Sequence, residues 1–279
     1  MRKEGTAVRS RCRALYAAVM ILLMICADTG CAEECVWPEA SGTRVYRDGG
    51  FQIDSSNSTL GYVMIRGPKS EKELKLRIKK DDTTLTYDLN MEGQYEVFPL
   101  QLGSGRYRIQ LFRNSGQNRY TEIGDYSVNT ELYREDAAFL VPNQYVDYTP
   151  ETKAVLMSWD MCANAATDRE KFDLIRDFIR NNFVYDYMQA VNLSVRSGTL
   201  PDIDWCFTYR RGICQDLSAV AACMLRVENI PAKVVIGYAN NSYHAWVELT
   251  ADGVELRYDP TADIVKQYRD VVYCPERWY

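Results

Sequence analysis

Hydrophobic and polar residues alternate along the first half of the chain, in short runs separated by turn residues. The run 107–112 alternates with period two and has one mixed face, as is typical of a half-buried antiparallel strand. The pattern predicts a small all-β sandwich over residues 45–130. Its expected strands are 61–66, 74–79, 85–89, 95–100 and 106–113, of which the second and third are joined across Asp81-Asp82.

Helical periodicity replaces this alternation in the second half of the chain. A helix is predicted over residues 151–162, and the run 167–183 places its apolar residues at helical spacing. Thr167 with Glu170 forms a capping-box pattern, which marks the start of this second helix. A third apolar helix is expected to begin near Gly212.

Pro231 ends the third helical pattern, and β-like segments follow it. These segments are residues 233–238, 243–249 and 254–258. Helices first and an antiparallel sheet last are typical of an α+β domain, which we predict over residues 131–279. The fold class predicted for the whole chain is therefore α+β, with an all-β module in front.

The first 31 residues have a pattern of their own. Five basic residues precede an unbroken apolar run from Ala14 to Ala27, too short for an ordinary membrane-spanning helix. We therefore predict a signal peptide over residues 1–31 and a secreted or cell-surface protein. Gly30 before Cys31 suits a bacterial lipoprotein signal, but Asp28 stands where an aliphatic residue is usual. Ordinary cleavage is thus favoured over lipidation of Cys31, an uncleaved anchor stays open, and no other membrane contact is expected.

Composition and charge narrow the classes of partner. Hydrophobic residues make up 47% of the 279 and charged residues 25%, as in a folded globular protein. Without residues 1–31 the net charge is about −8, which argues against nucleic acid as a partner. The nine cysteines show no Cys-x-x-Cys pair and no repeating framework, and the chain has one histidine. We predict no structural metal and no cofactor.

Three residues late in the chain are candidates for nucleophilic catalysis. Cys214 lies at the start of the third helix, where free backbone N–H groups and the helix dipole favour a thiolate. His244, the single histidine, lies in a predicted strand, and Asp259 follows the next one. Taken singly, each residue has a structural interpretation: a buried cysteine, a surface or core histidine, and a turn residue before Pro260.

The hairpin at Asp252-Gly253 decides whether His244 and Asp259 can meet. With a two-residue loop, Trp246 faces Asp259 and His244 lies diagonal to it on the same face of the sheet. With a four-residue loop, His244 faces Asp259 directly. A three-residue loop places the two on opposite faces. In either of the first two registers, a carboxylate reaches the imidazole.

These residues lie within a longer set of motifs. Taken together, the set resembles the transglutaminase-like superfamily, in which the order is Cys, His, Asp. The resemblance covers roughly residues 150–265, and the segment 169–187 looks like the preceding helices of that family. One departure is Val254–Tyr258, where many members carry a Trp shortly before Asp-Pro-Thr. The motifs are Gly212-Ile213-Cys214-Gln215-Asp216, Ile230-Pro231-Ala232, Gly237-Tyr238, His244-Ala245-Trp246 and Tyr258-Asp259-Pro260-Thr261.

The resemblance implies a papain-like fold and a protein or peptide substrate. The expected chemistry is acyl transfer on amide bonds through a thioester on Cys214, with hydrolysis slightly favoured over cross-linking. His244 would move the proton and Asp259 would orient the ring. The backbone N–H of Cys214 is a natural oxyanion donor, and Trp205 and Gln215 are weaker candidates for the cleft.

Two other classes of protein are considered. The first is a non-catalytic cell-surface protein that uses the same scaffold, with the sandwich binding a surface protein or a glycan. The second is a calcium-regulated cross-linker, which Asp202 and Asp204 do not support, because no loop with regular oxygen-ligand spacing surrounds them. The complete triad of residue types counts against the non-catalytic protein.

Overall fold

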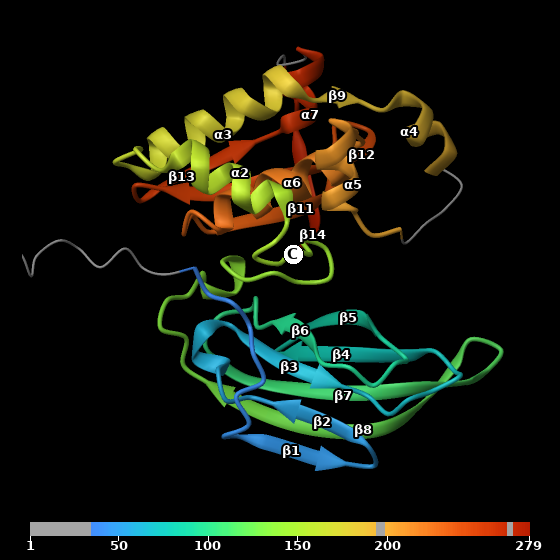
Figure 1. Cartoon of the computed structure of the whole chain (residues 1–279). Helices are drawn as coiled ribbons and strands as arrows, with labels where there is room; N and C mark the ends of the chain where they lie inside the picture. Colours follow the sequence, from blue (N-terminus) through green and yellow to red (C-terminus); the bar gives the residue numbers. More distant parts are fainter. Residues whose placement is uncertain (1–34, 194–198, 267–269) are drawn as a thin grey trace, which may run out of the picture. The chain divides into compact units, whose positions relative to one another are not determined.

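The N-terminal half of the described chain consists of two four-stranded antiparallel sheets (Figure 1). The computed structural model describes residues 35–193, 199–266 and 270–279, so the predicted leader and Cys31 lie outside it. The first sheet has the order β1-β2-β3-β6, with β1 (Val45–Asp48), β2 (Phe51–Asp54), β3 (Tyr62–Arg66) and β6 (Glu96–Pro99). The second has the order β5-β4-β7-β8, with β4 (Leu74–Lys80), β5 (Thr83–Leu89), β7 (Gly105–Gly116) and β8 (Arg119–Thr130).

Alternating side chains explain why these two sheets pack face to face. In β4, Leu74, Leu76 and Ile78 are buried, whereas the residues between them are at least partly exposed. Apolar residues from both sheets, among them Ile53 and Phe98, join these three in one core cluster. Each sheet therefore turns one apolar face to the other, as in a β-sandwich. The predicted all-β module is confirmed in its class.

A second antiparallel sheet system forms the C-terminal half, together with the helices. Its sheet has the order β13-β12-β11-β14, with β11 (Ala232–Ala239), β12 (Ser242–Ala251), β13 (Val254–Tyr258) and β14 (Tyr273–Trp278). The helices are α2 (Lys153–Cys162), α3 (Asp168–Asn182), α4 (Tyr187–Leu193), α5 (Ile203–Tyr209), α6 (Cys214–Arg226) and α7 (Pro260–Val265). The short elements are β9 (Val184–Tyr185), β10 (Arg211–Gly212) and the 3-10 turns Ser58–Leu60 and Ala137–Phe139. The predicted α+β class is confirmed.

Helix α6 is the centre of this half. Every residue from Asp216 to Arg226 is buried, because α2, α3 and α5 surround the helix and β11 and β12 lie against it. Most of these residues are apolar, and the buried polar exceptions are Asp216, Ser218 and Arg226. The helix presents only its first turn, which begins with Cys214, to a partly exposed environment.

The predicted capping box at the start of α3 is present, with a shift of one residue. The hydroxyl of Thr167 accepts the N–H of Glu170 at 3.1 Å. The Glu170 carboxylate accepts the N–H of Ala166 at 2.7 Å, one residue before the cap. Asp252, in the hairpin turn between β12 and β13, accepts the N–H groups of Asp168 and Arg169, each at 3.1 Å. The turn therefore holds the start of the helix against the sheet.

The sequence pattern missed β8 and several short elements. Helices α5 and α7 have seven and six residues, too few for a clear helical period, and each begins after an Asp cap. Strand β14 contains Pro275 and charged residues and lies at the edge of its sheet, where a proline is tolerated. β14 passes so close to Gly237 that an added Cβ would lie 2.1 Å from the carbonyl oxygen of Cys274.

Contacts group Cys35–Tyr279 as one unit, so the domain boundary predicted at residue 130 stays a prediction. Within the described ranges, none of the helices has the length and apolar character that a membrane span requires.

Candidate active site

The local structure before α6 fixes Cys214 at the helix N-terminus. The carboxylate of Asp216 accepts the N–H of Ile213 at 3.0 Å and the side-chain amide of Gln189 at 2.9 Å. Gly212 is required at the approach, because a Cβ there would lie 2.8 Å from both Asp216 and Cys206. The first N–H groups of a helix have no partner within it, so they point toward the region of the Cys214 thiol.

The β12–β13 hairpin has the two-residue loop. Ala251 pairs with Val254, and Asp252 and Gly253 have φ of 51° and 76°, as a tight turn of this kind requires. The pairing of Val247 with Tyr258 continues this register, so His244 lies diagonal to Asp259 on the same face. The Nε2 atom of His244 is 2.8 Å from Oδ2 of Asp259. The other ring nitrogen is left for the hydrogen bond with Cys214.

Asp259 is held in place by more than the histidine. It is the N-cap of α7, and its Oδ1 accepts the N–H of Ala262 at 2.9 Å. The hydroxyl of Tyr273, on β14, donates to Oδ2 at 2.8 Å. Burial acts to raise the pKa of Asp259, but the bonds from His244, Ala262 and Tyr273 lower it below its usual range. The carboxylate is therefore ionised and oriented at neutral pH.

The electrostatics of His244 favour the imidazolium. Burial of the ring, whose side chain is 14% exposed, opposes the charged form. The hydrogen bonds with Asp259 and Cys214 and the negative charge of both groups outweigh burial and raise the pKa of His244 to about 10. A charged imidazole that contacts both a carboxylate and a cysteine sulfur is oriented by the first and can give its proton to a group that leaves beside the second.

A cleft of about 750 Å³ opens onto the thiol. Its lining includes Cys214, His244, Gln215 and Tyr185. Burial, together with the nearby charge of Cys214, raises the pKa of Tyr185 to about 12, so its hydroxyl stays protonated and can donate a hydrogen bond. Gln215 accepts the hydroxyl of Tyr145 at 3.3 Å and donates to the backbone of Thr199 at 3.1 Å.

The structure places Trp205 outside this cleft, which corrects one of the weaker predictions. Trp205 lies on α5 and packs on Tyr209 at 5.1 Å between ring centroids. The rest of α5 and the short strand β10 lie between Trp205 and Cys214 in the sequence. The prediction for Trp205 rested only on this closeness in sequence. Gln215, the other weaker candidate, does line the cleft.

Sequence reasoning missed Tyr273, Tyr185 and Arg277. Tyr273 and Arg277 lie on β14, whose sequence gives no strand signal, and Tyr185 lies on the two-residue strand β9. Tyr185 falls within the segment 169–187 that resembles the family, although no role was attached to it. For the residues on β14, no local signal could have found them, because only the pairing of β14 with β11 brings Tyr273 to Asp259 and Arg277 to the cleft.

The other cysteines differ from Cys214 in their surroundings. Burial raises the pKa of Cys206 and Cys223 far above the ordinary range, and that of Cys162 to about 11. Cys274 is exposed and lies on the edge strand β14. Buried neutral thiols are inert, so Cys214 is the described cysteine that combines access with an imidazole.

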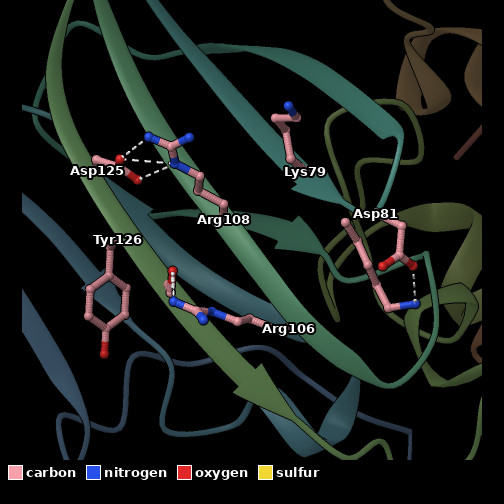
Figure 2. Close-up of a pocket in the computed structure, with 8 residues that line it drawn as sticks. Lys79, Asp81, Arg106, Arg108, Asp125 and Tyr126 are labelled. Atoms are coloured by element: carbon pink, nitrogen blue, oxygen red, sulfur yellow. Dashed lines mark hydrogen bonds and ion pairs between the residues drawn. The ribbon is translucent and has the colours of Figure 1, made fainter.

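A second hollow, of about 560 Å³, lies on the outer face of the sheet β5-β4-β7-β8 (Figure 2). Lys79 of β4 pairs in register with Arg108 of β7, and Arg108 forms an ion pair with Asp125. No thiol or imidazole is among the residues that line this hollow, so it is no candidate for acyl transfer. The protein or glycan ligand expected for the sandwich stays a prediction, as does the expected absence of metal and cofactor.

Removing the hydroxyl of Tyr273 tests its positioning role. Tyr273→Phe is expected to lower kcat about 10-fold with little change in KM, because Asp259 loses a hydrogen bond that orients it. The same loss raises the pKa of Asp259, so the acidic limb of the pH–rate profile should move to higher pH. Tyr120→Phe, which removes a 2.8 Å bond to Glu73 on the sandwich, is the matched control. An unmoved acidic limb would show that Tyr273 only packs.

Fold and site define an α+β domain of papain-like architecture, with a cysteine at the start of the central helix and His and Asp on the sheet. Residues 157–260 match the transglutaminase-like superfamily. The chain thus contains a transglutaminase-like domain, and the resemblance inferred from its sequence is confirmed.

Solved structures similar to this chain come from several organisms. One is a protein from Cytophaga hutchinsonii named as a candidate cysteine protease, with 18% identity, a TM-score of 0.39, and coverage of 78% of this chain and 68% of the other. A second is the periplasmic domain of TgpA from Pseudomonas aeruginosa, with 16% identity, a TM-score of 0.38, and coverage of 83% and 78%. A third is red sea bream transglutaminase, with 12% identity, a TM-score of 0.30, and coverage of 75% and 49%. A search of curated proteins finds no match.

Proposed function

We propose that this chain is a cysteine enzyme that transfers the acyl group of protein or peptide amides through a thioester on Cys214. The observation that carries the proposal is the hydrogen-bonded set Cys214, His244 and Asp259, of which the first two line the cleft. An imidazole whose pKa is raised to about 10 holds a proton beside the thiol at neutral pH. A cysteine with a purely structural role does not need a charged imidazole beside it.

The first half-reaction follows from these positions. The Cys214 sulfur attacks the carbonyl carbon, and the backbone N–H of Cys214 donates to the oxygen that becomes negative. His244 then gives its proton to the leaving nitrogen as the C–N bond breaks, so that an amine departs and a thioester remains. Asp259 keeps the ring in place and stabilises its charged form.

Water or an amine completes the reaction. His244, now neutral, takes a proton from the incoming group, which attacks the thioester and releases the sulfur. We favour hydrolysis because water reaches a partly exposed cysteine without a binding site, whereas an acceptor amine needs one. The leader pattern of residues 1–31 supports the further proposal that the enzyme acts outside the cytoplasm or at the cell surface.

Products made with and without an added amine test this function. Peptide amides incubated with the reduced protein should give the free acid, with a lesser share captured as a new amide when a primary amine is added in excess. Mass spectrometry of the peptides distinguishes the two products. Cys214→Ala should give neither.

The rival function is a non-catalytic surface protein in which the sandwich binds a protein or glycan. It predicts no product from any peptide amide and no difference between the wild type and Cys214→Ala. Persistent failure of a broad peptide set, with Cys214 also inert to alkylation, would favour the rival.

A further inference from the structure

One cation lies in the wall of the catalytic cleft. Arg277 on β14 pairs with Ile236 on β11, and Ile236 pairs on its other side with Ala245 on β12. Arg277 and Ala245 thus flank Ile236 in one row across the sheet, next to His244. The cleft lining includes Arg277 together with Cys214 and His244.

The surroundings of Arg277 leave its charge available. Within the described ranges, no carboxylate forms an ion pair with it, and no other Lys or Arg lines the cleft. Its Nη2 donates to the hydroxyl of Tyr243 at 2.7 Å, and a guanidinium has five N–H donors, so most remain for a ligand. The one Asp or Glu in the lining, Asp88, is already paired with Lys75.

Two aromatic rings line the cleft together with Arg277 and the thiol. Tyr145 and Tyr279 stack at 4.4 Å between centroids, and both line the cleft. Arg277 and Cys214 both act electrostatically on the hydroxyl of Tyr145, so both groups lie near this ring. Aromatic side chains exclude water, which strengthens a charge interaction in the cleft relative to one at an open surface.

We propose that Arg277 selects acyl donors that carry a carboxylate close to the amide bond that is attacked. This inference rests on the proposed function and names the class of its substrate: acidic peptides, such as those with a glutamate or aspartate beside the reacting carbonyl. A planar guanidinium binds a carboxylate through two parallel hydrogen bonds, which gives orientation as well as affinity. The carboxylate of the substrate takes the place of a counter-ion that the described residues do not provide.

Two small alkylating reagents test the charge preference without a known substrate. Iodoacetate carries a carboxylate and iodoacetamide is its neutral counterpart, and both form an S–C bond with Cys214 and release iodide. The ratio of their rates at Cys214, divided by the same ratio for free cysteine, measures the preference for an anion. We expect Arg277→Gln to lower this ratio about 10-fold, as for a charge-assisted hydrogen bond that is partly screened.

Matched variants separate charge from structure. Arg277→Lys keeps the charge without the planar fork and should retain part of the preference. Lys233→Gln removes a cation from β11 that packs on Phe139, outside the cleft, and should leave the ratio unchanged. Added salt should lower the ratio of the wild type more than that of Arg277→Gln.

The outcomes distinguish the two proposals. If Arg277→Gln leaves the ratio unchanged while Cys214 still reacts, the proposed role of Arg277 is overturned. The proposed function is not affected by that outcome. If Cys214 reacts no faster than free cysteine with either reagent, this result counts against the proposed function itself. With peptide amides, the preference should appear as a lower KM for Glu than for Gln at the recognised position, and Arg277→Gln should remove most of that difference.

Discussion

Replacement of His244 by alanine is expected to lower kcat/KM for peptide amides at least about 10³-fold, because the group that protonates the leaving amine is lost. Alkylation of Cys214 by iodoacetamide at pH 7 should also slow about 10-fold. Without the imidazolium, the thiolate has only the helix N-terminus to stabilise it, and an ordinary thiol is a few per cent ionised at this pH. Mass spectrometry of the labelled peptide gives the rate at this cysteine alone.

Cys274 provides an internal reference for the alkylation, because it is exposed and lies on a different strand. Its rate should be the same in the wild type and in His244→Ala. Equal rates for Cys214 in the two proteins would contradict the Cys–His pair and leave the cysteine as a structural residue.

The single histidine allows the charge of the pair to be followed directly by NMR, since the chain without a tag gives one set of imidazole signals. The ring should stay charged until the pH approaches 10 rather than 6.5. A raised pKa in the folded state means that this pairing contributes its full stability below about pH 6.5 and loses it as the pH rises toward 10. For Asp259, whose pKa is lowered, the contribution is present above about pH 4 and is lost as the pH falls.

Arg226→Met is expected to lower the free energy of unfolding by about 3 kcal/mol, the largest effect on stability that we foresee. Arg226 is fully buried on α6, and its guanidinium donates to the carbonyl oxygens of Ala232 and Val141 and to the backbone oxygen of Tyr279. Burial lowers its pKa to about 10, so it remains charged at neutral pH. Methionine fills similar space but donates to none of these oxygens, of which that of Tyr279 keeps the N–H of Val234.

Urea unfolding followed by circular dichroism measures this loss, which corresponds to a fall of about 6–12 °C in Tm for a chain of this size. Arg226→Lys keeps the charge, but an ammonium cannot reach all three acceptors, so an intermediate loss is expected. Arg47→Met, at an exposed position on β1, is the control and should be nearly neutral. A stability of Arg226→Met equal to that of the control would mean that water or other donors satisfy these oxygens once the guanidinium is gone.

Local signals predicted the elements that carry their own pattern. Apolar alternation predicted β4, and the cap at Thr167 predicted the start of α3. The apolar run before Pro231 predicted α6. The turn at Asp252-Gly253 was compatible with loops of two, three or four residues, and the structure has the two-residue loop. The short helices and β14 were missed because six or seven residues, or an edge strand with a proline, do not produce a period that stands out.

The sequence by itself determined the class of fold, the family and the candidate triad, because turns, caps and periodic burial act between residues close in the chain. Only the tertiary structure decided which distant groups surround that triad. Tyr273 reaches Asp259, and Arg277 reaches the cleft, through the pairing of β14 with β11. The buried Arg226 likewise finds its acceptors in segments far apart in the chain. Contacts of this kind depend on how finished elements pack, and no local pattern of residue types encodes them.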